Sequence, residues 1–206
     1  MMPFIQFQNR NILFVHIPKT GGSSVEAWME QHGKLNLFAA GMKPPALNCT
    51  PQHLRYWDLR QLFDPSFFDY AFAIVRNPFR RLESEYRMRM ILQGDPIHSK
   101  KPPFPIWLSA QLDAFERNAF HLDNHMRPLW HFTSDRTEVF RFEDGLDQII
   151  AKVAAKTGLP MPEVIPREMT SERFSGQIEW DQSDILRVQT IYQKDFETFG
   201  YALTPQ

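Results

Sequence analysis

The sequence predicts an α/β fold in which a parallel β-sheet is flanked by helices. Two continuous apolar runs, Ile12 to Ile17 and Tyr70 to Val75, are typical of buried parallel strands, and a helical pattern follows each of them. A third strand is predicted over Thr137 to Phe142, and apolar residues at helical spacing begin again at Leu146. Strands that alternate with helices favour parallel βαβ units.

The composition bounds the class of protein. The chain has 206 residues, 43% of them hydrophobic and 23% charged, which suits a single domain over residues 1–206 with a substantial core. The formal net charge of −1 argues against a nucleic-acid partner, since nucleic-acid binders carry a basic excess. The positive charge is mostly arginine, with 15 Arg against 8 Lys, and arginine is suited to bidentate phosphate contacts.

Cysteine content and the lengths of apolar runs bear on the cellular compartment of the protein. The single cysteine, Cys49, excludes an internal disulfide framework and is compatible with a reducing compartment. No apolar run reaches the roughly 20 residues that a membrane span needs, and residues 1–11 lack the basic and apolar regions of a signal peptide. We therefore expect a cytoplasmic protein without stable membrane insertion, although a trimmed lumenal domain would have the same features. Nothing in the sequence indicates an oligomeric state.

The first predicted strand leads into a turn of small and polar residues. Residues 1–11 are interpreted as a short lead-in, the strand stops at Pro18, and Lys19-Thr20-Gly21-Gly22-Ser23-Ser24 follows. Ser23-x-x-Glu26 has the spacing of a capping box, which predicts a helix from the serines to about His32. A strand, a glycine turn and a helix in this order point backbone N–H groups and a positive dipole end at an anion.

This turn differs from the ATP/GTP phosphate loop. That loop has the pattern G-x-x-x-x-G-K-[ST], whereas here Lys19 precedes the glycines. The turn still offers the Lys19 ammonium and the hydroxyls of Thr20, Ser23 and Ser24 to a nucleotide-like ligand. The alternative is an ordinary βα turn that uses glycine only for its geometry.

The second predicted strand is followed by an arginine-rich helix. Asn77 is a good N-cap and Pro78 fits the first helical position, so Arg76 is expected at the carboxyl end of the strand. Two favourable i,i+4 ion pairs are predicted on this helix: Glu83 with Arg87, and Glu85 with Arg89. These pairs account for some of the arginines but not for Arg76. Because ligands bind at the carboxyl ends of parallel strands, we expect Lys19 and Arg76 to share one edge of the sheet.

The remaining elements connect these two segments and follow them. Proline-rich stretches at residues 33–51 and 94–105 are predicted loops. Four further helices are predicted: Gln52 to Phe63, Ile106 to Phe120, Leu146 to Gly158, and Ser183 to Phe199.

Taken together, HIPKTGGSS and VRNPFRRLESEY resemble the two nucleotide-binding motifs of the sulfotransferases that use 3′-phosphoadenosine 5′-phosphosulfate (PAPS). The likeness is strongest to the membrane-type carbohydrate sulfotransferases and their bacterial relatives, and it implies a P-loop NTPase-like sulfotransferase fold. In that family the first motif grips the 5′-phosphosulfate, and the residues that match it are Lys19, Thr20, Gly21, Gly22, Ser23 and Ser24. The second motif, R-x-P-x-x-R-x-x-S-x-Y, holds the 3′-phosphate through its first arginine and its serine, here Arg76 and Ser84. Pro78, Arg81 and Tyr86 match the rest of it.

The resemblance implies a PAPS-dependent transferase that needs no metal and sulfates a hydroxyl of a carbohydrate or glycolipid. Lys19 would act on the leaving phosphate, and His53, in an H-x-x-Y context similar to that of relatives, would be the general base. His53 could equally be a surface or capping histidine. The other candidates for the base are His125 and a carboxylate, Asp58 or Glu26. His16 either contacts the nucleotide or packs at the strand end.

Three further residues are assigned from weaker likenesses. NHMRP resembles a family stretch near the acceptor cleft, which implies substrate-binding roles for His125 and Arg127, although Leu129 stands where glutamine is common. Arg173 lies where the family has a loop that closes over the nucleotide, so it is assigned to the 3′-phosphate or adenine side.

Two other functions remain open at the level of the sequence. One is a small-molecule kinase that uses ATP with magnesium, against which the missing lysine after the glycines counts. The other is a non-catalytic module that binds the desulfated nucleotide or a sulfated glycan.

Overall fold

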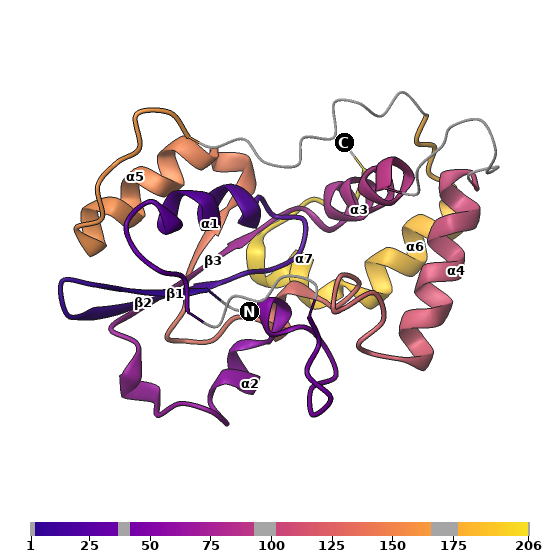
Figure 1. The fold of residues 1–206 in the computed structure, drawn as a ribbon. Coiled ribbons are helices and arrows are strands. Elements are labelled where there is room, and N and C mark those ends of the chain that lie inside the picture. The colour runs from indigo at the N-terminus through magenta and orange to yellow at the C-terminus, as the bar shows by residue number, and fades with distance from the viewer. Residues whose placement is uncertain (1–2, 37–41, 93–101, 166–176, 206) are drawn as a thin grey trace. The chain divides into compact units, whose positions relative to one another are not determined.

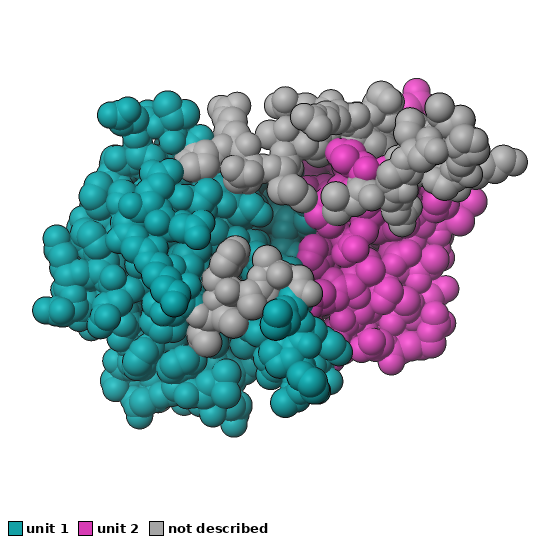
Figure 2. All heavy atoms as spheres, viewed as in Figure 1, with its two compact units in different colours: residues 1–76, 129–168 teal, residues 77–128, 169–206 magenta. Residues whose placement is uncertain are grey.

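The computed structural model describes residues 3–36, 42–92, 102–165 and 177–205. Their contacts divide the chain into two compact units, coloured separately in Figure 2. Unit 1 comprises residues 1–76 and 129–168, and unit 2 comprises residues 77–128 and 169–206. The chain therefore passes from one unit to the other three times, and each unit is assembled from two separate stretches. That all 206 residues form one domain stays a prediction.

Unit 1 contains a four-stranded sheet with the order β1-β2-β3-β4 (Figure 1). The strands are β1 (Phe4–Phe7), β2 (Arg10–Val15), β3 (Tyr70–Val75) and β4 (Glu138–Arg141). β2 pairs with β3 and β3 with β4 in parallel, which confirms the predicted α/β class with a mostly parallel sheet.

The first strand of the sheet was not predicted. β1 runs antiparallel to β2, whereas residues 1–11 were expected to be only a lead-in. A two-residue turn joins the strands, and both of its residues are left-handed, with φ 47° at Gln8 and 61° at Asn9. Turns of this kind match the twist of antiparallel strands, so the hairpin forms even without the usual glycine.

Helices α1 (Gly22–Glu30) and α5 (Leu146–Thr157) cover one face of the sheet (Figure 1). The core between them takes alternate strand residues, because successive side chains of a strand point to opposite faces. The strands contribute Ile12, Phe14, Phe72, Ile74 and Phe140, and the helices contribute Val25, Trp28, Met29, Ile149, Ile150 and Val153. Burying each such side chain stabilises the fold by about 1.5–3 kcal/mol.

Short elements complete unit 1. They are η1 (Pro51–His53), α2 (Tyr56–Leu59), η2 (Pro65–Phe67), η3 (Leu129–His131) and η4 (Phe142–Asp144). The single helix predicted over Gln52 to Phe63 is therefore wrong. Leu54 and Arg55 are extended, and the Arg55 backbone N–H donates to the Asp58 carboxylate at 2.8 Å, which starts a new helix at Tyr56.

Unit 2 is helical in its described part and contains α3 (Pro78–Leu92), α4 (Phe104–Arg117), α6 (Gln182–Ile191) and α7 (Gln193–Phe199). The predicted cap of α3 is confirmed, since Asn77 Oδ1 accepts from the backbone N–H of Phe79 at 2.9 Å. The helix predicted over Ser183 to Phe199 is divided at Tyr192, whose buried hydroxyl donates to the Met126 carbonyl at 2.6 Å. Among the residues that the structure describes, no helix has both the length and the apolar character that crossing a bilayer requires.

Candidate active site

The turn between β2 and α1 has an unusual backbone. Lys19 is left-handed with φ 69°, and Gly21 follows with φ 87°. A non-glycine residue in this region is strained by about 1–2 kcal/mol, so the surrounding contacts must hold it there. One such contact is the Thr20 hydroxyl, which is fully buried and donates to the Ile17 carbonyl at 2.8 Å. With that hydrogen engaged, Thr20 would offer an anion its backbone N–H rather than its hydroxyl.

The capping box predicted for Ser23 and Glu26 is wrong. The N-cap of α1 is Gly21, and the Glu26 carboxylate bonds His16 and Gln52 instead. Because the N-cap residue is a glycine, it offers no side-chain oxygen to the first amides of the helix, and the first turn carries no acidic residue. Such a helix start can accept an anion through its amides and its dipole.

Both glycines of the turn lie against side chains. A Cβ on Gly22 would stand 2.2 Å from His16 Nε2, and a Cβ on Gly21 would stand 2.9 Å from Phe142 Cε2. Only glycine fits at these two places without a shift of the neighbours. The glycines are therefore required by packing, whatever the ligand.

Arg76 joins the two motif segments. Its Nη1 donates to the Lys19 carbonyl oxygen at 3.2 Å across 57 residues of sequence. Its guanidinium also lies over the Phe142 ring, with Cζ 4.4 Å from the ring centroid. Lys19, Arg76 and Phe142 follow β2, β3 and β4, respectively, so all three belong to the carboxyl edge of the sheet. The expectation that the Lys19 and Arg76 segments meet at this edge is confirmed.

His53 lies in unit 1 on η1 and is buried. Its ring meets the His16 ring edge to face, with the ring centroids 5.3 Å apart. The Thr50 hydroxyl oxygen is 3.5 Å from His53 Nδ1, and the Cys49 thiol lies against the His53 carbonyl oxygen. The catalytic role of His53 stays a prediction.

Ser23 and Ser24 lie in the first turn of α1 in unit 1, and Ser24 is buried. The remaining predicted site residues belong to unit 2 or lie outside the described residues. Ser84 is buried on α3. Arg173 falls within residues 166–176, outside the described ranges, so its assignment stays a prediction.

His125 and Arg127 lie in a tightly bonded segment of unit 2. His125 Nδ1 is 2.6 Å from Glu85 Oε2. Arg127 is buried; its Nε donates to Asn124 Oδ1 and its Nη2 to the Ala119 carbonyl. These bonds give Arg127 a role in shaping the segment, and its contact with an acceptor stays a prediction.

The ionisation of Glu85 follows from its surroundings. Burial alone raises the pKa of this carboxyl, but the charge and hydrogen bond of His125, together with Arg89, outweigh burial and lower the pKa to about 2. The predicted ion pair of Glu85 with Arg89 is confirmed at 2.7 Å, and that of Glu83 with Arg87 at 3.4 Å. Glu85 is therefore a carboxylate at neutral pH.

Sequence reasoning missed two residues that organise the site, Gln52 and Phe142, and did not predict the contacts of a third, Glu26. A signal was present for Phe142, because it is the last residue of a predicted strand and so belongs to the carboxyl edge of the sheet. Glu26 was assigned to a local cap, and its bond to Gln52 joins residues 26 positions apart.

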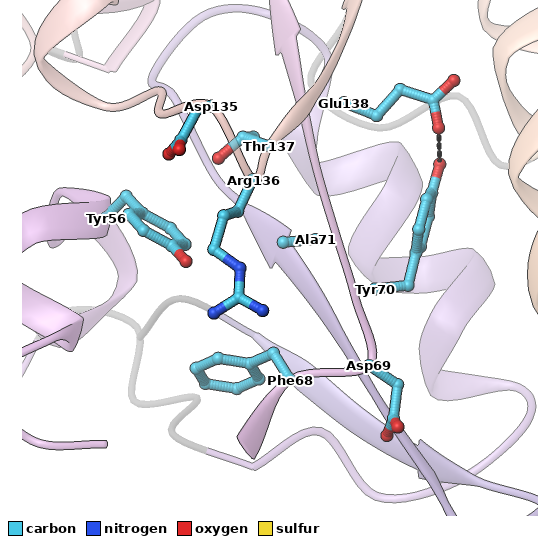
Figure 3. A pocket seen from close by; sticks show the side chains of 9 residues that line it. All are labelled: Tyr56, Phe68, Asp69, Tyr70, Ala71, Asp135, Arg136, Thr137 and Glu138. Carbon is cyan, nitrogen blue, oxygen red and sulfur yellow. Dashed lines mark hydrogen bonds between the residues drawn. The ribbon is translucent and has the colours of Figure 1, made fainter. Parts of the chain in front are cut away.

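A separate hollow of about 480 Å³ lies at the opposite edge of the sheet (Figure 3). It is lined by Tyr56, Phe68, Asp69, Tyr70, Ala71, Asp135, Arg136, Thr137 and Glu138. Figure 3 shows the Arg136 side chain reaching between the rings of Tyr56 and Phe68. Tyr70 donates to Glu138 at 2.6 Å, and burial together with this carboxylate raises the Tyr70 pKa. Because the hollow is at the amino ends of β3 and β4, it is not the site that Lys19 and Arg76 form.

The comparison with protein families fits the geometry at the carboxyl edge. A model of the sulfotransferase family matches residues 2–202, nearly the whole chain. The protein therefore belongs to the sulfotransferase family and is a transferase with a P-loop-like fold. Comparisons with curated proteins and with solved structures gave no match. Among the described residues, no group of three or more His, Cys, Asp or Glu side chains could hold a metal ion.

Proposed function

We propose that this protein transfers a sulfuryl group from PAPS to a hydroxyl of a carbohydrate or glycolipid. The observation that carries the proposal is the hydrogen bond from Arg76 to the Lys19 carbonyl. It brings together two cationic residues that the family resemblance assigns to the two anionic groups of one nucleotide. A 3′-phosphate and a 5′-phosphosulfate need separate cationic sites, and two neighbouring strand ends can supply them.

The residues of the turn suit the leaving group of this reaction. Sulfuryl transfer forms a bond from the acceptor oxygen to sulfur and breaks the bond from sulfur to the bridging phosphate oxygen, on which negative charge develops. By analogy with phosphoryl transfer, the transition state is in line and loose. The Lys19 ammonium and the first amides of α1 would stabilise this charge more in the transition state than in the ground state. The leaving phosphate is stable as an anion, so the step does not require a metal.

His53 would take the proton of the acceptor hydroxyl, and 3′-phosphoadenosine 5′-phosphate would leave as the second product. Arg76, Ser84 and Arg173 would hold the 3′-phosphate side of the donor, and His125 with Arg127 would contribute to the acceptor side. An imidazole has an ordinary pKa close to neutrality, which suits a general base.

The donor can be tested by titration calorimetry. We expect 3′-phosphoadenosine 5′-phosphate to bind more tightly than adenosine 5′-phosphate, which lacks the 3′-phosphate, and more tightly than ATP with magnesium. Arg76→Ala should remove the preference for the 3′-phosphate, whereas Arg60→Ala, at an exposed arginine of the same unit, should keep it. A preference for ATP, or indifference to the 3′-phosphate, would overturn the proposal.

The general base can be tested separately. His53→Ala should keep the affinity for the nucleotide and lower turnover by about 10²–10⁴-fold, because proton removal contributes that much to such reactions. The measurement is single-turnover transfer of labelled sulfate from PAPS to a panel of glycans. Unchanged turnover would assign proton removal to a different group.

A further inference from the structure

Behind the anion-binding turn of unit 1, a buried carboxylate gathers side chains from three segments. Glu26 on α1 is 5% exposed, and its Oε1 lies 2.6 Å from His16 Nδ1, just after β2. Gln52 Nε2 on η1 lies 3.1 Å from both Glu26 oxygens. It is also 3.3 Å from His16 Nδ1, because the two nitrogens converge on the same carboxylate.

Removing any member of this cluster would leave a buried polar group unsatisfied. A buried carboxylate without its donors is costly, and so is a buried donor without its acceptor. The His16 tautomer that satisfies this contact has its proton on Nδ1 and donates a hydrogen bond to Glu26 Oε1. On the other side of the ring, Nε2 faces the place that a Cβ on Gly22 would occupy, so the imidazole is wedged between Glu26 and the start of α1.

The two residues that bond Glu26, Gln52 and His16, both adjoin His53. Gln52 directly precedes His53 within the three residues of η1, and the His16 ring packs against the His53 ring. Glu26 thus acts on the candidate base in two ways, through the backbone next to it and through the ring beside it. Glu26 itself is fixed to α1, the helix whose first turn forms the anion site.

We propose that Glu26 is a positioning residue that holds His53 in place relative to the anion-binding turn, through Gln52 and His16. This inference rests on the proposed function, in which His53 removes the proton of the acceptor hydroxyl. A general base must lie within hydrogen-bond reach of that proton. A displacement of about 1 Å can cost about 10²-fold in rate, so a fixed relation between α1 and η1 has a direct effect on turnover.

The test uses two variants and two matched controls in the full-length protein. Gln52→Met keeps the length of the side chain and removes the bond to Glu26, and Glu26→Gln replaces one acceptor oxygen with a donor. Glu30→Gln and Gln61→Met make the same chemical changes at exposed positions of the same unit. We expect kcat to fall by about 10–10²-fold in the two variants, with the KM for PAPS within about threefold of wild type. The controls should be unchanged.

A mutant cycle separates positioning from general support of the fold. If Gln52 acts through His53, then Gln52→Met should cost little more once His53→Ala is already present. Losses that multiply in the double variant would overturn the proposal, as would an unchanged kcat in both single variants. Gln52 is half-buried, so Gln52→Met is expected to fold even where Glu26→Gln does not.

The histidine ring resonances give a readout that does not depend on turnover. We expect a downfield His16 Nδ1 proton that is lost in Glu26→Gln, and His53 ring signals that shift in Gln52→Met but not in Gln61→Met. Unmoved His53 signals would overturn the positioning role while the proposed function stands. Shifted signals in a protein that transfers no sulfate would overturn the proposed function, while the link from Glu26 to His53 through Gln52 would stand.

Discussion

At the scale of single residues, Arg76 shows how contacts on two sides orient a charged side chain. Its guanidinium is held by the Lys19 carbonyl on one side and by the Phe142 ring on another. A cation over an aromatic face gains about 0.5–2 kcal/mol, depending on how far water is excluded. The ring therefore orients Arg76 without neutralising its charge.

Replacing the ring should weaken nucleotide binding by a small and defined amount. Phe142→Leu keeps an apolar side chain and removes the aromatic face, so the affinity for 3′-phosphoadenosine 5′-phosphate should fall by about 2–5-fold. Phe142→Tyr keeps the face and should bind as wild type. Calorimetry measures both, and equal affinity in the leucine variant would show that the ring does not hold Arg76.

Lys19 combines a charge with a strained backbone, and two substitutions separate them. Lys19→Ala and Lys19→Gly both remove the ammonium, so each should lower turnover by about 10²–10³-fold. Only glycine relieves the left-handed conformation at φ 69°, so the glycine variant should be more stable than the alanine variant by up to about 1 kcal/mol. Urea unfolding of the two variants measures this difference. An alanine variant at least as stable as the glycine variant would argue against strain at Lys19.

At the scale of elements, local signals predicted most of the framework. The apolar runs gave β2 and β3, Asn77-Pro78 gave the start of α3, and Gly158 gave the end of α5, where φ is 78°. The failures have tertiary causes. The break before α2 lies where the Asp58 carboxylate takes the backbone N–H of Arg55. The division between α6 and α7 lies at Tyr192, whose side chain is bonded to the Met126 carbonyl.

The candidate site was predictable in part for the same reason. Lys19 and Arg76 could be placed at one edge because each follows a strand, and the periodicity of the chain marks where strands end. Glu26 and Gln52 could not be paired, because their contact depends on how a loop after α1 returns to that helix. The role of Arg81 was also hidden: it matches the second motif, but it is 1% exposed and bonds main-chain carbonyls.

Arg81 stabilises a strained segment of unit 2. Leu122, Asp123 and Asn124 are all left-handed, with φ between 50° and 67°. The carbonyls of the next three residues are bonded by buried side chains, since Arg81 donates to His125 and Arg127, and Tyr192 donates to Met126. A run of left-handed residues persists only where the surroundings over-determine it.

Arg81→Met should therefore destabilise the protein by about 3 kcal/mol or more, because it leaves two buried carbonyls without their charged donor. Arg81→Lys should recover only part of the loss, since a single ammonium cannot reproduce the planar fork. Arg117→Met, at an exposed arginine of α4, serves as the control. Chemical unfolding measures the stability of all three variants. An Arg81→Met protein as stable as the control would contradict the stabilising role of Arg81.

At the scale of the whole molecule, the ionisation of Glu85 makes the free energy of unfolding depend on pH. Its pKa is about 2 when folded and near 4.5 in its ordinary state, so the unfolded chain binds its proton first as the pH falls. The stabilisation is therefore complete above about pH 4.5 and is lost as the pH approaches 2. The gap between the two pKa values corresponds to about 3 kcal/mol.

Thermal unfolding of wild type and of Glu85→Gln between pH 6 and pH 2 tests this dependence. The wild type should be the more stable at pH 6, and the difference should shrink towards pH 2 as the wild-type carboxylate takes up its proton. Glu30→Gln should follow the wild-type curve throughout, because that side chain is exposed. A difference that does not change with pH would assign the effect of Glu85 to packing.

The threefold passage of the chain between the units bears on how the protein can be made. A nascent polypeptide that has been synthesised as far as Arg76 already contains Lys19 and Arg76, the two cations of the proposed donor site. The strand beside β3 and the ring that lies against Arg76 come only at residues 138–142. All of residues 77–128, which belong to unit 2, must leave the ribosome in between. Neither unit is encoded by one continuous stretch of the gene. A truncation or a recombination at a single point therefore cannot produce one complete unit without dividing the other.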